Sequence, residues 1–366
     1  MSSSALLALL TLQRIPNLGD ASIKKLIRHF GAATTVLEQK KAALLEVEGI
    51  GAHRLEHFYD PAHAAFAKAE LRYIEGNGIA VLGYQDEAYP ERLRHCLDGP
   101  VLLFQKGTID WDNPRMISIV GTRKMTAYGA ERIDAFMEEI ATLDPVIISG
   151  FAYGVDIAAH RAAMRHGLQT VACLAHGLDK LYPAVHRKYV AGMEQRGGFV
   201  TDFWSTDHFD RKNFLRRNRI IAGLSEATVV MESAAQGGSL VTAELANSYA
   251  RDVFAVPGRV NDPLSVGCNN LIKQNQAHLL TSAADLIYIM NWTLDRPSQP
   301  IQKQLFLDLE PQEQEVFNVL ERQHNEQLDT IALQCMRPPH QVASTLLSLE
   351  LKGVVRPLPG KRFELT

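Results

Sequence analysis

Five short apolar segments, rich in Ile and Val, recur between residues 116 and 256 of this 366-residue chain. They span residues 116–120, 146–149, 170–174, 228–231 and 253–256. Patterns with the length of crossover helices lie between them, for example over residues 128–143 and 155–166. Fully apolar strands joined through helices are typical of a parallel sheet that helices cover on both faces. The pattern therefore predicts an α/β domain with a doubly wound parallel sheet.

Small, hydroxyl-bearing and cationic residues follow each predicted strand. In chain order the turns contain Gly121-Thr122-Arg123-Lys124, Gly150 to Asp156, Ala175 to Lys180, Gly237-Gly238-Ser239 and Pro257-Gly258-Arg259. Any one of these turns is explained by a tight strand-to-helix connection. Ligands bind at the carboxyl ends of the strands in such sheets, and those ends share one edge. The five turns together therefore indicate a site for an extended, phosphate-bearing ligand.

The most basic segment of the chain is residues 211–219, in which five of nine residues are cationic. Phe214, Leu215, Ile220 and Ile221 interleave with the charges at near-helical spacing, which predicts a packed helix start. The alternative is a solvated helix face, the common explanation of a charge run. We favour a phosphate site, because Arg presents a planar fork of donors and nearby glycines allow close approach of a phosphate chain.

Composition places this chain among ordinary globular proteins of two or three domains, with 46% hydrophobic and 22% charged residues. The net charge of −3 means that any nucleic-acid site must be a local basic patch. The four cysteines are far apart and lack metal-ligand spacing, so neither a zinc site nor a disulfide framework is expected. The N-terminal apolar run resembles neither a signal peptide nor a membrane span, and we expect a cytoplasmic protein.

Smaller modules flank the predicted sheet. Residues 5–60 alternate short helices with Gly-containing turns at 15–19 and 47–51, a pattern that is compatible with phosphate contact or with a packing or partner-binding role. Residues 84–107 are interpreted as an extension of the sheet domain. The C-terminal residues predict three helices and a two-stranded wing, but the third helix has little charge for reading a DNA groove.

Two polar residues inside the sheet domain suggest catalysis or metal binding only weakly. His160 has no Ser or Cys placed with it in a nucleophile motif, so we expect it to pack inside its helix. Asp156 has no second carboxylate at ligand spacing, so we expect it to cap a helix start.

Taken together, the motifs over about residues 75–290 resemble the DNA-processing protein A family, also called Smf. The motifs that carry the resemblance are Ile119 to Arg123, Ser149 to Asp156 with Ala159-His160, Gly177 to Pro183, Phe214 with Arg217 to Ser225, Gly238 to Ala243 and Val253 to Gly258. The sequence departs from the family pattern at Tyr153, where Arg is common, and at Leu215, where Pro usually follows the Phe. Tyr153 offers a stacking ring in place of a phosphate contact.

The resemblance implies a bacterial cytoplasmic protein that binds single-stranded DNA and is not an enzyme. Such a protein protects incoming strands during natural transformation, loads RecA recombinase onto them and displaces single-strand-binding protein. It forms a homodimer through the Rossmann-like domain, and no cofactor is expected. The implied nucleic-acid-binding residues are Gly121, Thr122, Arg123, Ser149, Gly150, Tyr153, Gly154, Lys180, Phe214, Arg217, Asn218, Arg219, Gly238, Ser239 and Thr242.

The same resemblance predicts the domain organisation. Residues 1–66 would form a small helical domain of the helix-hairpin-helix or SAM-like type, and residues 67–292 an extended Rossmann-like domain that binds single-stranded DNA. Residues 293–309 would form a polar, Pro-containing linker, and residues 310–366 a winged-helix domain.

An enzyme is the main alternative: a nucleotide phosphoribohydrolase of the lysine-decarboxylase-like group. The segment Gly237 to Glu244 keeps two glycines and the Glu of that group's motif but has Leu240 where a further Gly belongs. A dinucleotide-dependent oxidoreductase is disfavoured, because residues 121–124 are not Gly-x-Gly-x-x-Gly. A pure scaffold for recombinase is a third possibility, and it predicts no direct DNA affinity.

Overall fold

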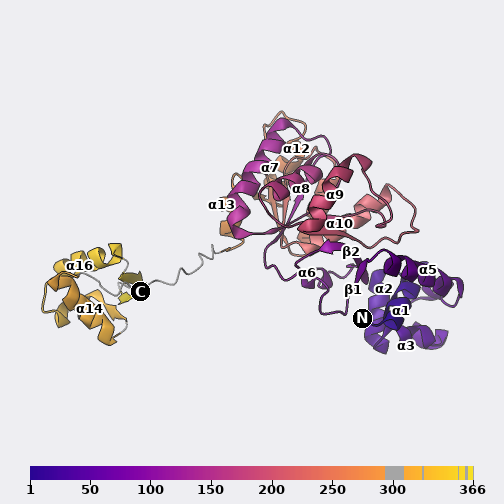
Figure 1. Cartoon of the computed structure of the whole chain (residues 1–366), viewed down its shortest axis with the longest axis horizontal. Coiled ribbons are helices and arrows are strands. Elements are labelled where there is room, and N and C mark those ends of the chain that lie inside the picture. Colours follow the sequence, from indigo (N-terminus) through magenta and orange to yellow (C-terminus); the bar gives the residue numbers. More distant parts are fainter. Residues whose placement is uncertain (293–308, 324, 353, 359–361, 366) are drawn as a thin grey trace. The chain divides into compact units, whose positions relative to one another are not determined.

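The computed structural model describes residues 1–292, 309–323, 325–352, 354–358 and 362–365 (Figure 1). The chain divides into two compact units, Met1–Leu294 and Asp295–Thr366. Residues 293–308 of the predicted linker lie outside the described residues. The predicted boundary between residues 66 and 67 stays a prediction, because both sides of it belong to the first unit.

A single large sheet forms the centre of the first unit. Its strands are β1 Ala80–Gly83, β2 Leu102–Thr108, β3 Met116–Val120, β4 Val146–Ser149, β5 Thr170–Cys173, β6 Gly197–Thr201, β7 Ala227–Val230, β8 Asp252–Ala255 and β9 His278–Leu279. Among the described residues these nine strands pair in the order β1-β2-β6-β5-β4-β3-β7-β8-β9. From β6 to β9 in this order every pairing is parallel, whereas β2 is antiparallel to both β1 and β6. The predicted doubly wound α/β fold is confirmed, with an antiparallel extension at one edge.

Helices cover both faces of this sheet. In the sheet region they are α6 Glu91–Arg94, α7 Ala127–Ile140, α8 Val155–Arg165, α9 Val190–Gln195, α10 Lys212–Leu224, α11 Gly238–Ser248, α12 Val266–Lys273 and α13 Ala283–Ile289, with 3₁₀ turns at Ala141–Leu143 and Ala184–Tyr189. Alternate residues of β3 point to opposite faces, so that Ile117 and Ile119 pack with α7 and α8 while Met116 and Val120 pack with α10 and α11. No helix in the described ranges is both long and apolar enough to cross a membrane.

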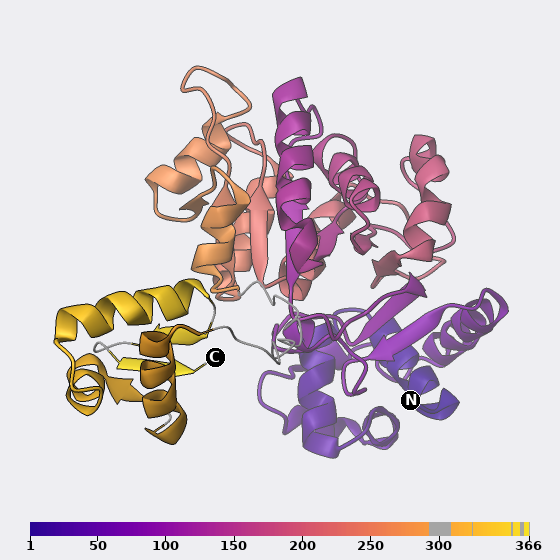
Figure 2. The same cartoon turned by 60° about the vertical axis from the view of Figure 1, so that its left-hand side comes forward.

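The N-terminal helices pack against the antiparallel edge of the sheet (Figures 1 and 2). They are α1 Ser3–Arg14, α2 Asp20–Phe30, α3 Ala33–Glu38, α4 Lys41–Leu45 and α5 Ala62–Gly76, with a 3₁₀ turn at Ala52–Leu55. Their apolar residues form one buried cluster with Leu102 and Phe104 of β2 and with Trp204. Within the short helices predicted over residues 5–60, the segment Ala52–Leu55 is a 3₁₀ turn and not an α-helix.

Strand β6 has no counterpart in the sequence prediction, because it begins with Gly197-Gly198 and a glycine pair is typical of a turn. Both glycines have positive φ angles, +134° and +156°. A Cβ on Gly197 would collide with the carbonyl oxygen of Thr170 in β5, and one on Gly198 with that of Lys106 in β2. The glycines thus allow β6 to join the parallel strands to the antiparallel pair.

The second unit has the architecture predicted for the C-terminal residues. Its elements are α14 Pro311–Gln323, β10 Glu326–Gln327, α15 Leu328–Gln334, α16 Pro339–Leu351, β11 Val355–Leu358 and β12 Arg362–Leu365. The strands pair in the order β10-β12-β11, and β11 and β12 form the wing. The turn of the wing, residues 359–361, lies outside the described residues. The winged-helix prediction is confirmed.

Replacing Glu313 by Gln is expected to destabilise this second unit at neutral pH by about 1 kcal/mol. The Glu313 carboxylate accepts hydrogen bonds from Lys352 Nζ at 2.5 Å, Ser348 Oγ at 2.6 Å and the Glu310 N–H at 2.9 Å. These bonds, that of Lys352 foremost, lower the pKa of Glu313 from 4.5 to about 2. The Lys352 side chain is 40% exposed, so solvent screens much of the interaction.

The stabilisation from Glu313 should be complete above about pH 4.5 and should be lost as the pH falls towards 2, because the folded-state pKa is the lower one. Hydrogen exchange of α14 and α16 in the full chain measures it. We expect the variant to exchange faster than wild type at pH 7 and the difference to shrink at pH 3. If the exchange rates of the variant and wild type differed equally at pH 7 and pH 3, the ionised Glu313 carboxylate would not be the source of the stabilisation.

Candidate nucleic-acid interface

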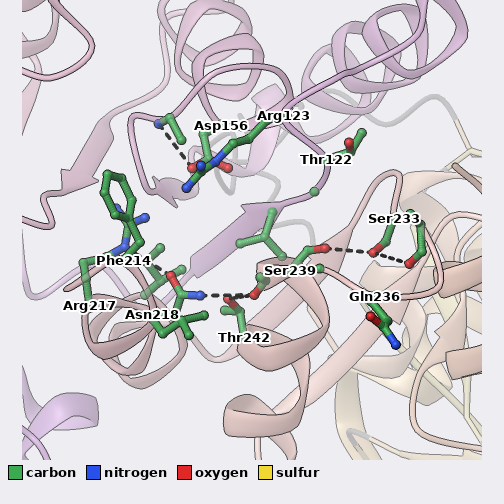
Figure 3. A pocket seen from close by; sticks show the side chains of 18 of the residues that line it. Thr122, Arg123, Asp156, Phe214, Arg217, Asn218, Ser233, Gln236, Ser239 and Thr242 are labelled. Carbon is green, nitrogen blue, oxygen red and sulfur yellow. Dashed lines mark hydrogen bonds between the residues drawn. The ribbon is translucent and has the colours of Figure 1, made fainter. Parts of the chain in front are cut away.

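The order of the strands places a crevice between β3 and β7. From β3 the chain proceeds through β4, β5 and β6 on one side and returns to form β7, β8 and β9 on the other. Ligands of such sheets bind where the order reverses, at the carboxyl ends of the strands. A pocket of about 410 Å³ lies at this point (Figure 3). Residues from the turns after β3, β4 and β7 line it together with residues of α10 and of the N-terminal part of α11.

Backbone contacts lock the three turns around the pocket to one another. The Thr122 N–H donates to the Glu232 carbonyl at 2.7 Å, and the Val155 N–H donates to the Thr122 carbonyl at 3.1 Å. Gly154 has a φ of +74°, and a Cβ there would collide with the carbonyl oxygens of Thr122 and Arg123. A Cβ on Gly121 would collide with the Val155 side chain. Both glycines are therefore required for the close approach of these turns.

The N-terminus of α11 opens onto the pocket. Gly237, Gly238 and Ser239 all line it. The N-cap residue is Gly237, which has no side chain that could accept a hydrogen bond from the first-turn N–H groups. The Leu240 N–H donates to the Gly237 carbonyl at 3.2 Å. The N–H groups at the very start of a helix lack intrahelical acceptors and lie at the positive end of the helix dipole, which suits an anion. Asn218 Nδ2 donates to the Gly238 carbonyl at 3.1 Å and so joins α10 to α11.

Arg217 forms the cationic floor of the pocket. Its side chain is buried and donates to the Gly150 carbonyl at 2.6 Å and to the Cys173 carbonyl. Burial lowers the pKa of Arg217 and raises that of Asp156, and the opposite charges of the two groups act against both shifts. Arg217 thus ties α10 to the turns after β4 and β5, in addition to facing the pocket.

Arg123 and Phe214 lie at the mouth of the pocket. The Arg123 guanidinium carbon is 5.0 Å from the centroid of the Phe214 ring, and the Arg123 side chain is exposed. A cation over an aromatic face orients both groups without using the donors of the guanidinium. An exposed cation beside a half-buried ring can contact a phosphate and a base of the same nucleotide.

The structure brings part of the predicted site together. The predicted residues that line the pocket are Gly121, Thr122, Arg123, Phe214, Arg217, Asn218, Gly238, Ser239 and Thr242. Gly150 and Gly154 shape its walls through the contacts above. Ser149 is buried and donates to the Ile119 carbonyl at 2.6 Å. Tyr153 is 45% exposed and packs against His186 at a ring distance of 5.2 Å, outside the pocket lining.

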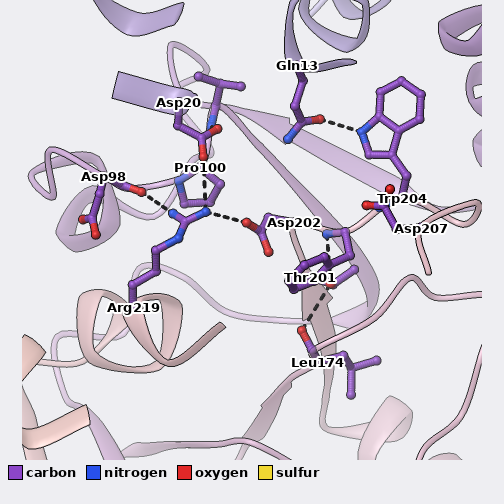
Figure 4. A network of polar contacts seen from close by, with 12 residues as sticks. Gln13, Asp20, Asp98, Pro100, Leu174, Thr201, Asp202, Trp204, Asp207 and Arg219 are labelled. Carbon is purple, nitrogen blue, oxygen red and sulfur yellow. Dashed lines mark hydrogen bonds and ion pairs between the residues drawn. The ribbon is translucent and has the colours of Figure 1, made fainter. Parts of the chain in front are cut away.

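Two predicted cations, Arg219 and Lys180, do not line the pocket. Arg219 donates to the Asp202 carboxylate and to Asp20 Oδ2 at 3.2 Å, and also to the Asp98 carbonyl (Figure 4). Residues two apart on a helix point about 200° apart, so Arg217 and Arg219 face opposite sides of α10. Lys180 Nζ donates to the carbonyls of Ser205 at 3.3 Å and Asp207 at 2.9 Å. Of the two arginines predicted to bind DNA, Arg217 lines the pocket and Arg219 does not.

Several pocket residues are absent from the sequence-based set. These are Val120, Ala152, Asp156, Arg211, Leu215, Ile221, Ser233, Ala234, Gln236 and Gly237. Arg211 lies in the basic segment and Gly237 in the glycine-containing turn, so these two residues could have been predicted from the sequence. Asp156 lies in the first turn of α8, and its carboxylate accepts a hydrogen bond at 3.3 Å from the N–H of Ala152, which precedes the helix. His160 is buried and bonds Thr170 Oγ1 through Nδ1 at 2.7 Å, as its predicted packing role requires.

Comparison with known proteins gives a family for this chain. The family model for DNA recombination-mediator protein A matches residues 80–291, and the model for the DprA winged helix domain matches residues 302–361. Protein Smf of Escherichia coli (strain K12) is 31% identical over 353 residues, which cover 93% of this chain and 91% of that protein.

Two solved structures are also similar to this chain. The X-ray structure of DNA processing protein A from Streptococcus pneumoniae gives a TM-score of 0.64 at 30% identity, covering 76% of this chain and 95% of that one. A structure that describes the single-stranded DNA binding mode of DNA processing protein A from Helicobacter pylori gives 0.53 at 28% identity, covering 58% and 95%. The chain therefore belongs to the DNA recombination-mediator protein A family, the DprA/Smf proteins.

Proposed function

We propose that this protein binds single-stranded DNA in the pocket between β3 and β7. The observation that carries the proposal is the meeting of three features at one point: the N-terminus of α11, the exposed guanidinium of Arg123 and the ring of Phe214. The first two suit a phosphate and the third suits a base. The Helicobacter pylori relative, whose structure describes single-stranded DNA binding, supports the assignment.

Binding by these groups is independent of base sequence. Backbone N–H groups and a guanidinium contact phosphates, which are the same in every nucleotide, and an aromatic ring stacks on any base. A duplex keeps its bases paired and stacked, so the ring has no base to accept. The proposal therefore predicts a preference for single strands, with an affinity that falls as the salt concentration rises.

The proposal extends to the recombination-mediator role after which the family is named. In that role the chain protects incoming single strands during natural transformation, loads RecA recombinase onto them and displaces single-strand-binding protein. It acts as a cytoplasmic homodimer without catalysis. Family membership supports this extension, and a RecA-loading assay on strands coated with single-strand-binding protein tests it.

Replacing Arg123 by Ala is expected to weaken binding to oligo-dT about tenfold at low salt, because one charge-assisted phosphate contact is lost. The slope of log affinity against log salt concentration should become shallower by about 0.7, the value for one phosphate on a single strand. Fluorescence anisotropy with labelled oligo-dT and a matching duplex, at two or more salt concentrations, measures both quantities.

Arg196→Ala is the matched control for this charge removal. Arg196 precedes β6 at the opposite, amino-end edge of the parallel strands, and its side chain is 58% exposed. The affinity of the Arg196→Ala variant for oligo-dT and the salt dependence of that affinity should equal those of wild type. Equal losses in the two variants would contradict the pocket assignment, and absence of any wild-type binding would overturn the DNA proposal.

The hydrolase alternative finds less support in this geometry. Glu244, the acid of the corresponding motif, is exposed and is not among the pocket-lining residues. An assay for release of a free base from nucleoside monophosphates tests the alternative directly.

A further inference from the structure

Two aromatic side chains beside the pocket are exposed to solvent, Tyr182 at 40% and Phe209 at 44%. Their ring centroids lie 4.9 Å apart, and they lie 5.9 and 5.7 Å from the ring of Phe214. We refer to Tyr182, Phe209 and Phe214 as the aromatic triad. Phe214 lines the pocket, so the triad continues from the pocket onto the open surface.

The segment that carries Phe209 is held in place from several sides. Lys180 Nζ donates to the carbonyls of Ser205 and Asp207. Asp207 also pairs with Arg14 of α1 at 3.1 Å, and Ser205 donates to Glu70 of α5 through both its N–H, at 2.9 Å, and its hydroxyl, at 2.6 Å. The N-terminal helices and Lys180 therefore anchor a segment that ends in an exposed ring. This arrangement reduces the ordering cost of binding at the ring.

The charges around the triad favour a nucleobase over an apolar peptide as its occupant. Arg123 and Arg217 lie 5.0 and 6.0 Å from the Phe214 centroid, and Arg211 lines the adjoining pocket. Aromatic rings next to cations in a groove are the arrangement by which proteins hold single strands without sequence preference. Asp156 also lines the pocket and offsets part of this positive charge. A partner helix with an apolar face would leave the remaining positive charge without an anionic partner.

We propose that Tyr182 and Phe209 form a stacking platform for a base that neighbours the nucleotide held in the pocket. This proposal rests on the proposed function, since it extends the same strand beyond Phe214. Lys180 is then a positioning residue: it fixes the Phe209 segment through carbonyl contacts and does not need to touch DNA. The platform accepts purines and pyrimidines alike.

The double variant Tyr182→Ala/Phe209→Ala is expected to bind oligo-dT about 5- to 100-fold more weakly than wild type, the range for loss of base stacking on an aromatic ring. Its salt slope should not change, because no phosphate contact is removed. On an abasic oligonucleotide of equal length, wild type and the double variant should bind equally, because that probe has phosphates but no bases.

The control is Tyr59→Ala/Tyr288→Ala, which removes two aromatic rings, 51% and 85% exposed, from positions outside the pocket lining and the aromatic triad. It should bind both probes as wild type does. A second variant, Tyr182→Leu/Phe209→Leu, keeps apolar side chains at both positions and removes the aromatic faces. We expect it to fold and to show the same selective loss on oligo-dT.

Each result decides between the two proposals. If the Ala and the Leu double variants at Tyr182 and Phe209 both bound oligo-dT with wild-type affinity, the platform would be overturned and the pocket proposal would remain intact. An equal loss on oligo-dT and on the abasic probe would also overturn the platform, since the loss would not depend on bases. Absence of wild-type binding to oligo-dT at low salt would overturn the proposed function, and the platform with it.

Discussion

Replacing Arg219 by Ala is expected to lower the free energy of unfolding of the first unit by about 3–5 kcal/mol, the usual cost of removing one partner from a buried ion pair. The Arg219 side chain is 11% exposed and that of Asp202 is 2% exposed. Without the guanidinium, Asp202 and Asp20 would remain as like charges in a buried site. Burial already raises the pKa of Asp20, and the charge of Arg219 is the largest effect that opposes this shift.

Urea denaturation followed by tryptophan fluorescence measures this effect, because the described tryptophans, including Trp204 beside the network, all belong to the first unit. Arg216→Ala is the control: Arg216 is the same residue type on the same helix, and its side chain is exposed. It should shift the unfolding free energy by no more than about 1 kcal/mol, the value of its exposed cation–π contact.

Adding Asp202→Asn to Arg219→Ala tests the electrostatic cause. The neutral amide removes the uncompensated charge, so we expect part of the lost stability to return in the double variant. Failure of Asp202→Asn to restore any stability would mean that the loss comes from packing of the Arg219 side chain and not from the unpaired carboxylates.

Gly238→Asp is expected to weaken single-stranded DNA binding at least about fivefold, the equivalent of 1 kcal/mol, while leaving the fold intact. Gly238 is the first residue of α11, and a Cβ there would have no neighbour closer than Asn218 Nδ2 at 3.8 Å. An acidic residue in the first turn of a helix is stabilising by about 0.3–1 kcal/mol. A phosphate about 4 Å from the new carboxylate would be repelled by about 1 kcal/mol in water and about 4 kcal/mol at the effective dielectric constant of a protein surface.

Gly238→Asn is the matched control, because its side chain has the same shape without the charge. Its affinity for oligo-dT should stay within a few-fold of wild type, and raising the salt concentration should narrow the gap between the two variants. Anisotropy titrations at two salt concentrations measure the gap, and thermal unfolding of both variants checks the fold. Equal affinities of the Asp and Asn variants would place the phosphate away from the N-terminus of α11.

The strands show how far local sequence determines this fold. Residues 116–120 and 146–149 are rich in Ile and Val and contain one serine each, and they form β3 and β4 with the predicted bounds. Strand β6 was not predicted. Its two glycines are required because the backbones of β5 and β2, which are distant in sequence, leave no room for a Cβ. A prediction from local propensity considers only residues that are close in sequence, so it does not include these contacts.

The site divides in the same way. The α/β fold, the winged helix and the turns at the carboxyl ends of the strands could be predicted from the sequence, because all of them depend on local pattern and on a general rule of sheet topology. Which cations line the pocket could not be predicted in this way. Arg217 and Arg219 are equivalent in a list of basic residues, but Arg219 meets Asp202 and, at 199 residues' separation, Asp20. Whether an arginine of α10 faces the pocket or is held by the carboxylates of Asp202 and Asp20 depends on contacts between segments that are distant in the chain.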